Sequence, residues 1–200
     1  MDWLKDENSK KILLEAVQRF TPMLEKELKE NGVQAMVEFV YFNLDNMLEK
    51  SGLKKQFTCS KGCNFCCNSE ITISSYEASF IYSFIEQMNV PVNYKQLKKL
   101  NEVGIDNLPF KQKACPLLDD KGACSIYEIR PSICRIHGVI NNPKYCDFSK
   151  YKGRSKMGRI IETYALTSAL VVLDSKLNKF AEPVELHKVL HEYLTYPIRD

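Results

Sequence analysis

Apolar residues recur at helical spacing near the N-terminus. One face of a first helix is formed by residues three or four positions apart: Ile12, Leu13, Ala16, Val17 and Phe20. Thr21-Pro22 then predicts a restart, because threonine favours the N-cap and proline the first helical position. Asn31-Gly32 predicts a stop. A third helix is expected over 33–50, so the first fifty residues should form a helical scaffold.

The pattern becomes short and irregular in the middle of the chain. The β-branched run at 71–74 predicts a brief strand. Ser74 and Glu77 have the spacing of a capping box, which predicts a helix that continues to about Met88. A further short helix is expected over 94–101. Residues 104–123 show no periodicity and are expected to be irregular.

Helical periodicity returns at the C-terminal end. Residues 157–180 are apolar nearly all round at their centre, which predicts a buried helix. Pro183 predicts the start of a last helix over 184–194. The fold class we expect is mainly α, a single helical domain around an irregular cysteine-rich metal-binding centre with little β. Its parts are an N-terminal helical unit (1–57), a cysteine-cluster region (58–150) and a C-terminal helix pair (151–200).

Composition and charge restrict the classes of protein to which the chain can belong. The chain has 200 residues, of which 44% are hydrophobic and 26% charged, so disorder and collagen-like structure are excluded. The net charge is only +3, and no segment has the charge of a nucleic-acid module. The most apolar stretch, 164–173, has about half the length of a bilayer span. With a charged N-terminus as well, we expect a cytoplasmic protein with no nucleic-acid partner and no membrane association.

All eight cysteines lie in the middle of the chain, and both helical flanks lack them. In a reducing compartment, clustered cysteines indicate metal binding or catalysis rather than disulfides. The predicted metal ligands are Cys59, Cys63, Cys66, Cys67, Cys115, Cys124, Cys134 and Cys146.

The first group consists of Cys59, Cys63, Cys66 and Cys67, and its spacing favours metal binding. Thiolates two or three residues apart converge on one soft cation if the backbone turns tightly, and Gly62 permits such a turn. Four sulfurs satisfy zinc, and four thiolates equally hold an iron–sulfur cluster. Cys66 and Cys67 are adjacent, so their side chains generally point apart. Two four-sulfur sites, or one cluster with free thiols, therefore both remain open.

The spacing Cys59-x3-Cys63-x2-Cys66 is also that of the radical S-adenosylmethionine motif. Such enzymes use most of a β/α barrel after the motif. This chain has no alternating strand–helix pattern there, and the immediate Cys67 departs from the motif. A spacing match alone is weak, and we do not adopt this architecture.

Both cysteine groups together carry a family resemblance. The matching stretches are Cys59 to Cys67, then Cys115-Pro-Leu-Leu, then Cys124 to Arg135 with its Tyr-x2-Arg-Pro-x2-Cys-Arg pattern. On these residues the chain resembles the CxxCxxCC family, also called YkgJ-like cysteine-cluster proteins and described as zinc- or iron-chelating. The resemblance covers roughly 59–146 and implies an iron–sulfur cluster or zinc held by the cysteines.

The family includes flagellin lysine N-methylases, so the resemblance also implies an enzymatic alternative. That alternative adds S-adenosylmethionine as a cofactor and a protein as the substrate. The glycines of this chain form no Gly-x-Gly-x-x-Gly loop, and no cofactor-binding segment is apparent. A third alternative is a structural zinc-binding interaction module without catalysis. Redox chemistry is a further option, and no catalytic residue is assigned.

Two arginines are the candidates for binding an anionic group of a cofactor. Arg130 and Arg135 flank Cys134, where they can offset the charge of thiolates or hold a substrate anion. The alternative is a structural ion pair, with Glu128 as the acid.

Other polar residues have weaker signals. His137 follows Cys134 closely but is more typical of a surface or supporting histidine. His187 and His191 share one helical face, and we interpret them as a solvated pair. The basic residues in 144–159 are interpreted as countercharge for an anionic centre rather than as a nucleic-acid site.

Overall fold

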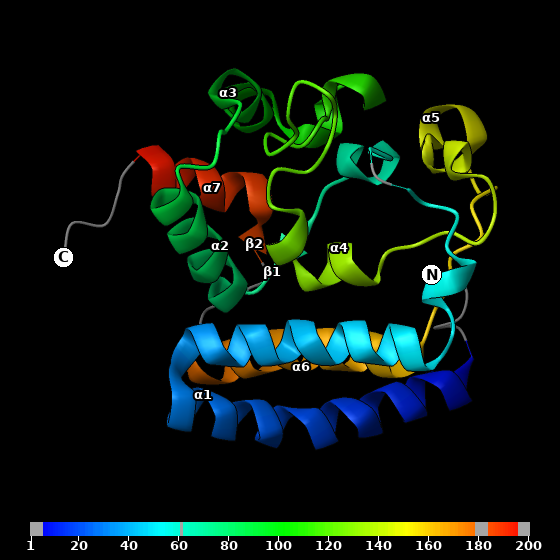
Figure 1. The fold of residues 1–200 in the computed structure, drawn as a ribbon, viewed down its shortest axis with the longest axis vertical. Helices are drawn as coiled ribbons and strands as arrows, with labels where there is room; N and C mark the ends of the chain where they lie inside the picture. Colours follow the sequence, from blue (N-terminus) through cyan, green and yellow to red (C-terminus); the bar gives the residue numbers. More distant parts are fainter. Residues whose placement is uncertain (1–5, 61, 179–183, 196–200) are drawn as a thin grey trace.

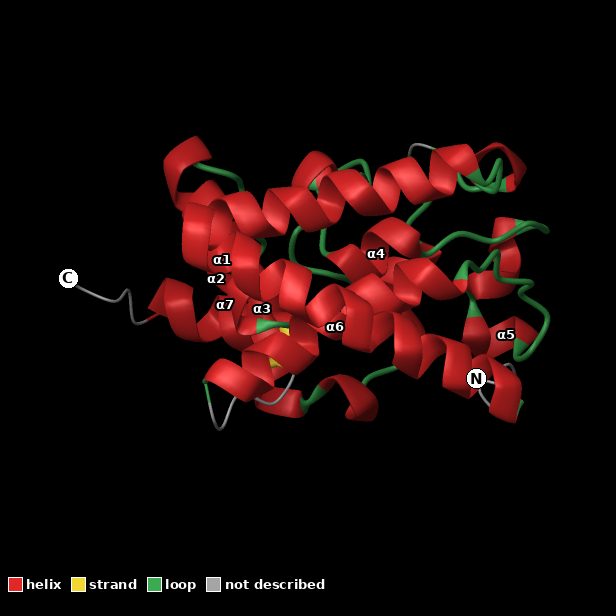
Figure 2. Cartoon of the chain, turned by 90° about the horizontal axis from the view of Figure 1, so that it is seen from below, coloured by secondary structure: helices red, strands yellow, loops and turns green. Residues whose placement is uncertain are grey.

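The computed structural model describes residues 6–60, 62–178 and 184–195. Within this part the chain is mainly helical, and its only sheet has two strands of two residues each. The predicted fold class is therefore confirmed. Figure 2 shows how little strand lies among the helices. None of the helices in the described ranges has both the length and the apolar character needed to cross a membrane.

Helix α1 (Glu7–Lys50) is a hairpin of two arms. It begins at the N-cap Asp6, whose carboxylate accepts the Ser9 backbone N–H at 2.8 Å. The arms meet at Gly32, whose φ of 82° is a conformation that glycine adopts without strain. Figure 1 shows the arms running antiparallel. The stop predicted at Asn31-Gly32 is confirmed.

The restart predicted at Thr21-Pro22 is wrong, because α1 continues through Pro22. The Thr21 hydroxyl does not cap a new helix but donates to the Val17 carbonyl at 2.8 Å. Proline removes one backbone donor from a helix interior. Phe20 and Leu24 on either side are buried in the core, so packing holds the helix together across this position.

Helix α6 (Ile161–Leu177) lies along both arms of α1 and completes a three-helix layer (Figure 1). The centre of this layer is a cluster of fully buried side chains: Leu24, Met36, Leu44, Leu166, Leu170 and Leu173. The buried helix predicted for this segment is confirmed, although it begins at Ile161 rather than at residue 157. Its predicted end at Phe180 lies outside the described residues.

A second hydrophobic cluster lies beyond this layer. It is formed by helices α2 (Ser75–Met88), α3 (Tyr94–Val103) and α7 (Leu186–Thr195) with the sheet of β1 (Thr72–Ile73) and β2 (Val184–Glu185). The strands are antiparallel, with Thr72 opposite Glu185. The strand predicted at 71–74 is confirmed as β1. The helix predicted from 184 begins two residues later because β2 comes first, and Pro183 lies outside the described residues.

The cysteine-cluster region (58–150) includes α2 and α3 of the second cluster, and its remaining segments contact both clusters. It contains the short helices α4 (Ser132–Ile136) and α5 (Phe148–Tyr151), and α4 packs against both α1 and α6. The 3-10 turns are η2 (Lys54–Gln56), η3 (Phe65–Asn68), η4 (Ile105–Asn107), η5 (Phe110–Gln112), η6 (Tyr127–Ile129) and η7 (Pro143–Cys146). Phe80 and Ile129 pack against both hydrophobic clusters, so the region is anchored on two sides.

His187 is buried at the start of α7, so the interpretation of a solvated histidine pair is wrong for this residue. Only 5% of His187 is exposed, and its Nε2 lies 3.2 Å from a carboxylate oxygen of Glu185. Burial is the main cause that lowers the pKa of His187, Lys188 lowers it further, and Glu185 opposes them.

We therefore expect stability to fall as the solution is acidified. Because the pKa of His187 is lower in the folded chain than the ordinary 6.5, the unfolded chain binds more protons between these two values. The stability that neutral His187 contributes is present above about pH 6.5 and is lost as the pH falls toward the folded-state pKa. Urea unfolding at pH 7.5 and pH 5.5 should show a larger loss for the wild type than for His187→Leu. Equal losses would contradict this assignment.

Candidate metal centre

The two ends of the cysteine region are joined to each other. The Thr58 backbone N–H donates to the Val139 carbonyl at 2.9 Å, and the Thr58 hydroxyl also bonds to the Asn141 carbonyl. The ring of Phe57 lies so close to Gly138 and Gly158 that a Cβ on either glycine would come within 2.5 or 2.6 Å of it. These glycines are needed for close approach, and they hold the entry and the exit of the region together.

The first cysteine group is a tight turn followed by the 3-10 turn η3. The Cys63 backbone N–H donates to the Ser60 carbonyl at 2.9 Å, and Gly62 has a φ of 86°. The tight turn expected from Gly62 is thus present. Cys66 and Cys67 are the second and third residues of η3. This local geometry brings four thiols into one short stretch of backbone.

The second group consists of Cys115, Cys124, Cys134 and Cys146. Backbone hydrogen bonds bring Cys115 and Cys124 next to the first group. The Cys115 backbone N–H donates to the Cys67 carbonyl at 2.8 Å. A turn at 119–122 folds the chain back, so that Leu118 pairs with Cys124 in an isolated antiparallel bridge. The Asn64 side chain donates to the Gly122 carbonyl at 3.1 Å, which ties this turn to η3. The two bonds that join this group to η3, from Cys115 to Cys67 and from Asn64 to Gly122, each connect residues more than forty positions apart in sequence.

All eight cysteines are free thiols, and six of the other seven interact electrostatically with Cys66. These six thiols are Cys63, Cys67, Cys115, Cys124, Cys134 and Cys146. Cys59 interacts with Cys63 and Cys146. Cys59 is exposed, Cys146 is buried, and the others lie between these extremes. The structure therefore brings all the predicted metal ligands into one neighbourhood.

The surroundings oppose ionisation of most of these thiols. Burial raises the pKa of Cys115 to about 12 and that of Cys146 to about 12. Burial also raises the pKa of Cys134 well above its ordinary value. The hydrogen bond between Cys66 and Cys67 lowers the pKa of Cys66 and raises that of Cys67. Buried thiolates of this kind need a cation to compensate their charge.

Thiols are ligands that suit zinc and iron, but the thiols of this structure do not form a closed coordination shell. Among residues 6–60, 62–178 and 184–195, no three Cys, His, Asp or Glu side chains converge tightly enough to hold an ion as they stand. The thiols are nevertheless neighbours, unpaired and soft, which is the donor set that zinc and iron–sulfur clusters take. Closing a shell requires the thiols to turn toward a common cation.

Arg130 is a cation that acts on two of the thiols. Its guanidinium lies 4.0 Å from the ring centre of Tyr127 and donates to the Tyr127 carbonyl at 2.6 Å. Its charge adds to the hydrogen bond with Cys67 in lowering the pKa of Cys66, and it partly opposes the burial that raises the pKa of Cys124. This placement accords with the prediction that Arg130 offsets thiolate charge.

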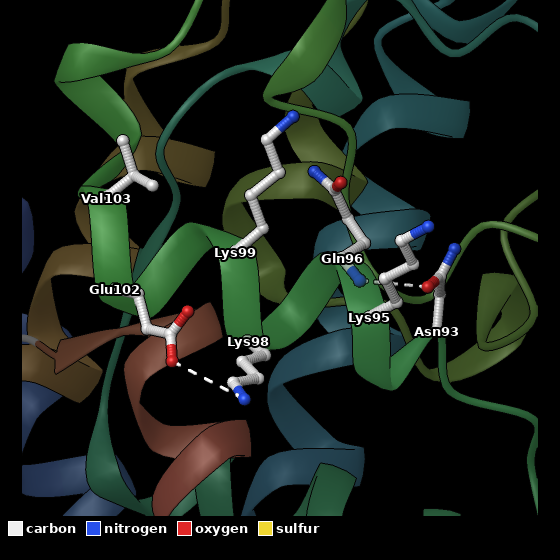
Figure 3. Close-up of a pocket in the computed structure, with 7 residues that line it drawn as sticks. All are labelled: Asn93, Lys95, Gln96, Lys98, Lys99, Glu102 and Val103. Atoms are coloured by element: carbon white, nitrogen blue, oxygen red, sulfur yellow. Dashed lines mark hydrogen bonds and ion pairs between the residues drawn. The ribbon is translucent and has the colours of Figure 1, made fainter.

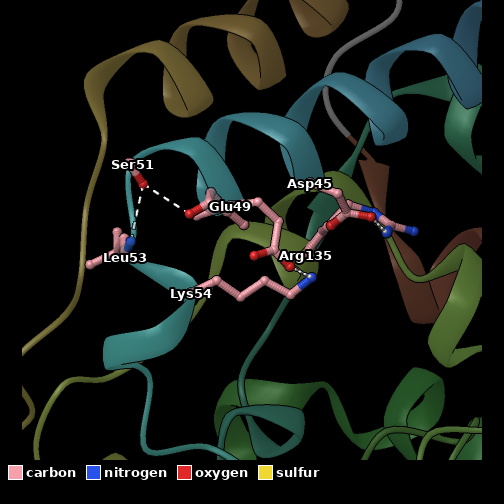
Figure 4. Close-up of polar contacts among 7 residues, drawn as sticks. Asp45, Glu49, Ser51, Leu53, Lys54 and Arg135 are labelled. Atoms are coloured by element: carbon pink, nitrogen blue, oxygen red, sulfur yellow. Dashed lines mark hydrogen bonds and ion pairs between the residues drawn. The ribbon is translucent and has the colours of Figure 1, made fainter.

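Arg135 is engaged by protein groups on several sides. Its guanidinium forms an ion pair with Asp45 of α1 at 2.6 Å (Figure 4), and it also donates to the Glu128 carbonyl. It stacks on Tyr41 with 4.4 Å to the ring centre, and 6% of the residue is exposed. These contacts are those of the structural alternative, with Asp45 as the acid in place of the Glu128 carboxylate. The Asp45 partner, ninety residues away, has no signal in the sequence.

A buried carboxylate supports the helix that carries Cys134. Glu77 of α2 accepts the Ser132 backbone N–H at 2.6 Å and the Tyr41 hydroxyl at 3.2 Å. The Ser74 side chain accepts the Glu77 backbone N–H, and the Glu77 carboxylate bonds back to the Ser74 N–H. The capping box is therefore present. Its spacing signalled the helix start but gave no sign that Glu77 also holds α4.

His137 lies close behind Cys134 in the chain. Its Nε2 is buried without a hydrogen-bond partner, and burial is the main cause that lowers its pKa. The nearby charge of Arg159 lowers the pKa further. The lowered pKa favours the neutral imidazole, and the half-buried ring turns its Nε2 atom away from solvent.

Two pockets of the described residues can be compared with the position of the cysteines. A surface pocket of about 440 Å³ lies over α3, where Lys95, Lys98 and Glu102 line it (Figure 3). It contains no cysteine. A second pocket touches Cys115 and His187, and its volume of about 20 Å³ holds about one water molecule.

The comparison with protein families agrees with this site. The family model CxxCxxCC, described as "Putative zinc- or iron-chelating domain", matches residues 58–158, just over half of the chain. The chain belongs to this family. Neither the curated proteins nor the solved structures contain a match to it. The matched segment begins at Thr58 and ends at Gly158, where the structure joins the two ends of the region.

Proposed function

We propose that the protein holds an iron–sulfur cluster through its clustered thiolates. The observation that carries this proposal is the gathering of six thiols around Cys66, with no disulfide among the eight cysteines. Membership of a zinc- or iron-chelating family supports it. When bound, such a cluster would supply electron-transfer or Lewis-acid chemistry.

The protein's own residues prepare the site for an anionic centre. Arg130 compensates thiolate charge from the side of η6, next to Cys66 and Cys124. Glu77 and Arg135 fix the start and the end of α4, and through it the position of Cys134. We favour iron over zinc because four cysteines lie within nine residues at 59–67 and the family is associated with iron as well as with zinc.

Anaerobic purification followed by metal analysis and a visible spectrum tests this proposal. We expect iron, acid-labile sulfide and the broad visible absorption of thiolate-bound iron–sulfur clusters. A colourless protein with stoichiometric zinc would replace the proposal by the structural zinc module. A protein without either metal would contradict the chelating function itself.

The Cys63→Ser variant should lose metal. Cys63 lies in the middle of the first group, and its thiol hydrogen-bonds with Cys59 and interacts with Cys66. A serine hydroxyl is a poor ligand for soft cations, so the metal content per chain is expected to fall by half or more. Ser60→Ala in the same turn is the matched control and should keep the full content. Unchanged metal in Cys63→Ser would remove Cys63 from the ligands.

Methyl transfer and redox catalysis are retained as predictions of the family resemblance. No substrate pocket is assigned. The pocket beside Cys115 is far too small for S-adenosylmethionine, whereas ligand pockets of that class have volumes of about 300 Å³ or more. Chelation by the clustered thiols is the function that the described residues support best.

A further inference from the structure

We propose that a cationic surface on η7, α5 and the loop before α6 binds an acidic surface of a protein partner beside the cysteine region. This cationic surface consists of five exposed basic residues: Lys144, Lys150, Lys152, Arg154 and Lys156. The proposal goes beyond the proposed chelating function, and it does not depend on which metal the cysteines hold.

The charge of the cationic surface has no counterpart among the described residues. Lysines on the long helices pair with acids one turn away, as Lys26 does with Glu30 on α1. None of the five cations forms an ion pair within the described part of the chain. The one acid in 144–159 is Asp147, which is buried. Like charges gathered in this way repel each other, and an acidic partner relieves that repulsion.

The backbone beneath these cations is fixed by pairing with the chain at 140–141. The Ile140 N–H donates to the Lys156 carbonyl at 2.9 Å, and the Asn141 side-chain amide donates to the Arg154 carbonyl at 2.8 Å. The Lys156 N–H in turn donates to the Asn141 side-chain oxygen at 3.0 Å. An ordered backbone lowers the conformational entropy that a binding surface loses when it meets a partner.

The aromatic side chains among the cations favour a protein partner over a nucleic acid. Tyr145 and Tyr151 pack edge to face with 5.4 Å between their ring centres, and Lys144 Nζ lies 5.4 Å from the centre of the Tyr145 ring. These rings are engaged with each other, whereas stacking of bases needs free ring faces. Phe148, between Lys144 and Lys150 in the chain, is 40% exposed. An exposed aromatic residue among charged ones is typical of a protein interface.

The cationic surface adjoins the exposed side of the cysteine cluster. The turn η7, which ends at Cys146, packs against η3, which contains Cys66. The Thr58 N–H donates to the Val139 carbonyl, which places the exposed Cys59 next to the same stretch of chain that pairs with the cationic loop. Figures 1 and 2 both place α5 at the opposite end of the molecule from α2 and α7. A partner on this surface therefore lies beside the cysteines.

Fluorescence anisotropy with the full chain and a labelled peptide rich in glutamate and leucine tests the proposal. The peptide should bind at about 10 mM salt and more weakly at about 100 mM, because the Debye length falls from about 30 Å to about 10 Å. The same peptide with glutamine in place of glutamate should not bind. Failure of the glutamate peptide to bind would overturn the proposal. Tighter binding of single-stranded oligothymidylate of equal charge, or of phosphatidylserine vesicles, would also overturn it.

Substitutions show whether the binding belongs to this surface. Lys152→Gln combined with Arg154→Gln should weaken peptide binding at least about fivefold. Lys95→Gln combined with Lys111→Gln removes the same charge from two exposed lysines elsewhere and should leave the affinity within about twofold. Phe148→Ala should weaken binding at both salt concentrations, because its contact is apolar. Equal losses in the two double variants would overturn the proposal.

Metal analysis of the same variants separates docking from a countercharge role. The variant with Lys152→Gln and Arg154→Gln should keep the metal content of the wild type. A selective loss of metal in this variant would show that the two cations compensate the charge of the cysteine centre, and would overturn their docking role. A wild type without metal would instead contradict the chelating function and not this surface.

Discussion

The Glu77→Ala variant should lose about 3 kcal/mol of unfolding free energy, because leaving a buried donor unpaired costs about 1–3 kcal/mol. The substitution removes the acceptor of the Ser132 N–H and of the Tyr41 hydroxyl, and both of these residues are buried. It also removes half of the capping box of α2. Urea denaturation under anaerobic conditions measures the loss.

Two companion variants test the cause of this effect. Glu86→Ala changes an exposed glutamate on the same helix and should alter stability by no more than about 0.5 kcal/mol. Glu77→Gln keeps an acceptor oxygen for Ser132 and should lose less than Glu77→Ala. A Glu77→Ala variant as stable as Glu86→Ala would show that the network contributes nothing to stability.

Leu170→Ala should have an effect of similar size, about 3 kcal/mol, through the three-helix layer. Leu170 is completely buried on α6 between the two arms of α1. Leucine-to-alanine changes in cores lose transfer energy and leave a cavity, at a cost of about 2–5 kcal/mol. Val172→Ala on the same helix is the matched control, since 44% of Val172 is exposed and its truncation should cost less than about 1 kcal/mol.

Equal stabilities of the two variants in urea unfolding would contradict this packing. A selective loss in Leu170→Ala, with the metal content unchanged, would show that the layer stabilises the fold independently of the cysteine region.

Local patterns predicted the elements that depend on local interactions. The capping box at Ser74, the turn at Gly32 and the apolar run of α6 all appear as expected. Pro22 failed as a helix start because buried neighbours decide whether a helix continues, and their burial comes from α6. β2 was missed because a strand of two residues has no periodicity of its own and forms by pairing with β1.

The candidate site also contains both residues that local patterns predict and residues that only the tertiary fold reveals. The cysteines and Arg130 could be selected from spacing and residue type alone. Asp45 could not, because its contact with Arg135 joins two elements ninety residues apart. The role of Glu77 toward α4 was hidden for the same reason. Long-range polar contacts follow from the tertiary fold, and a single sequence carries no pattern that reports them.

The joined ends of the cysteine region make it a portable insert. Phe57 lies against Gly158, and α1 and α6, which precede and follow the matched segment, pack directly on each other as well as on α4 of that segment. A segment whose two ends are neighbours can be exchanged between hosts with little disturbance of either part. A graft of the chelating module onto another helical pair would need 184–195 as well as 58–158, because β2 and α7 pack on β1, α2 and α3 of the matched segment.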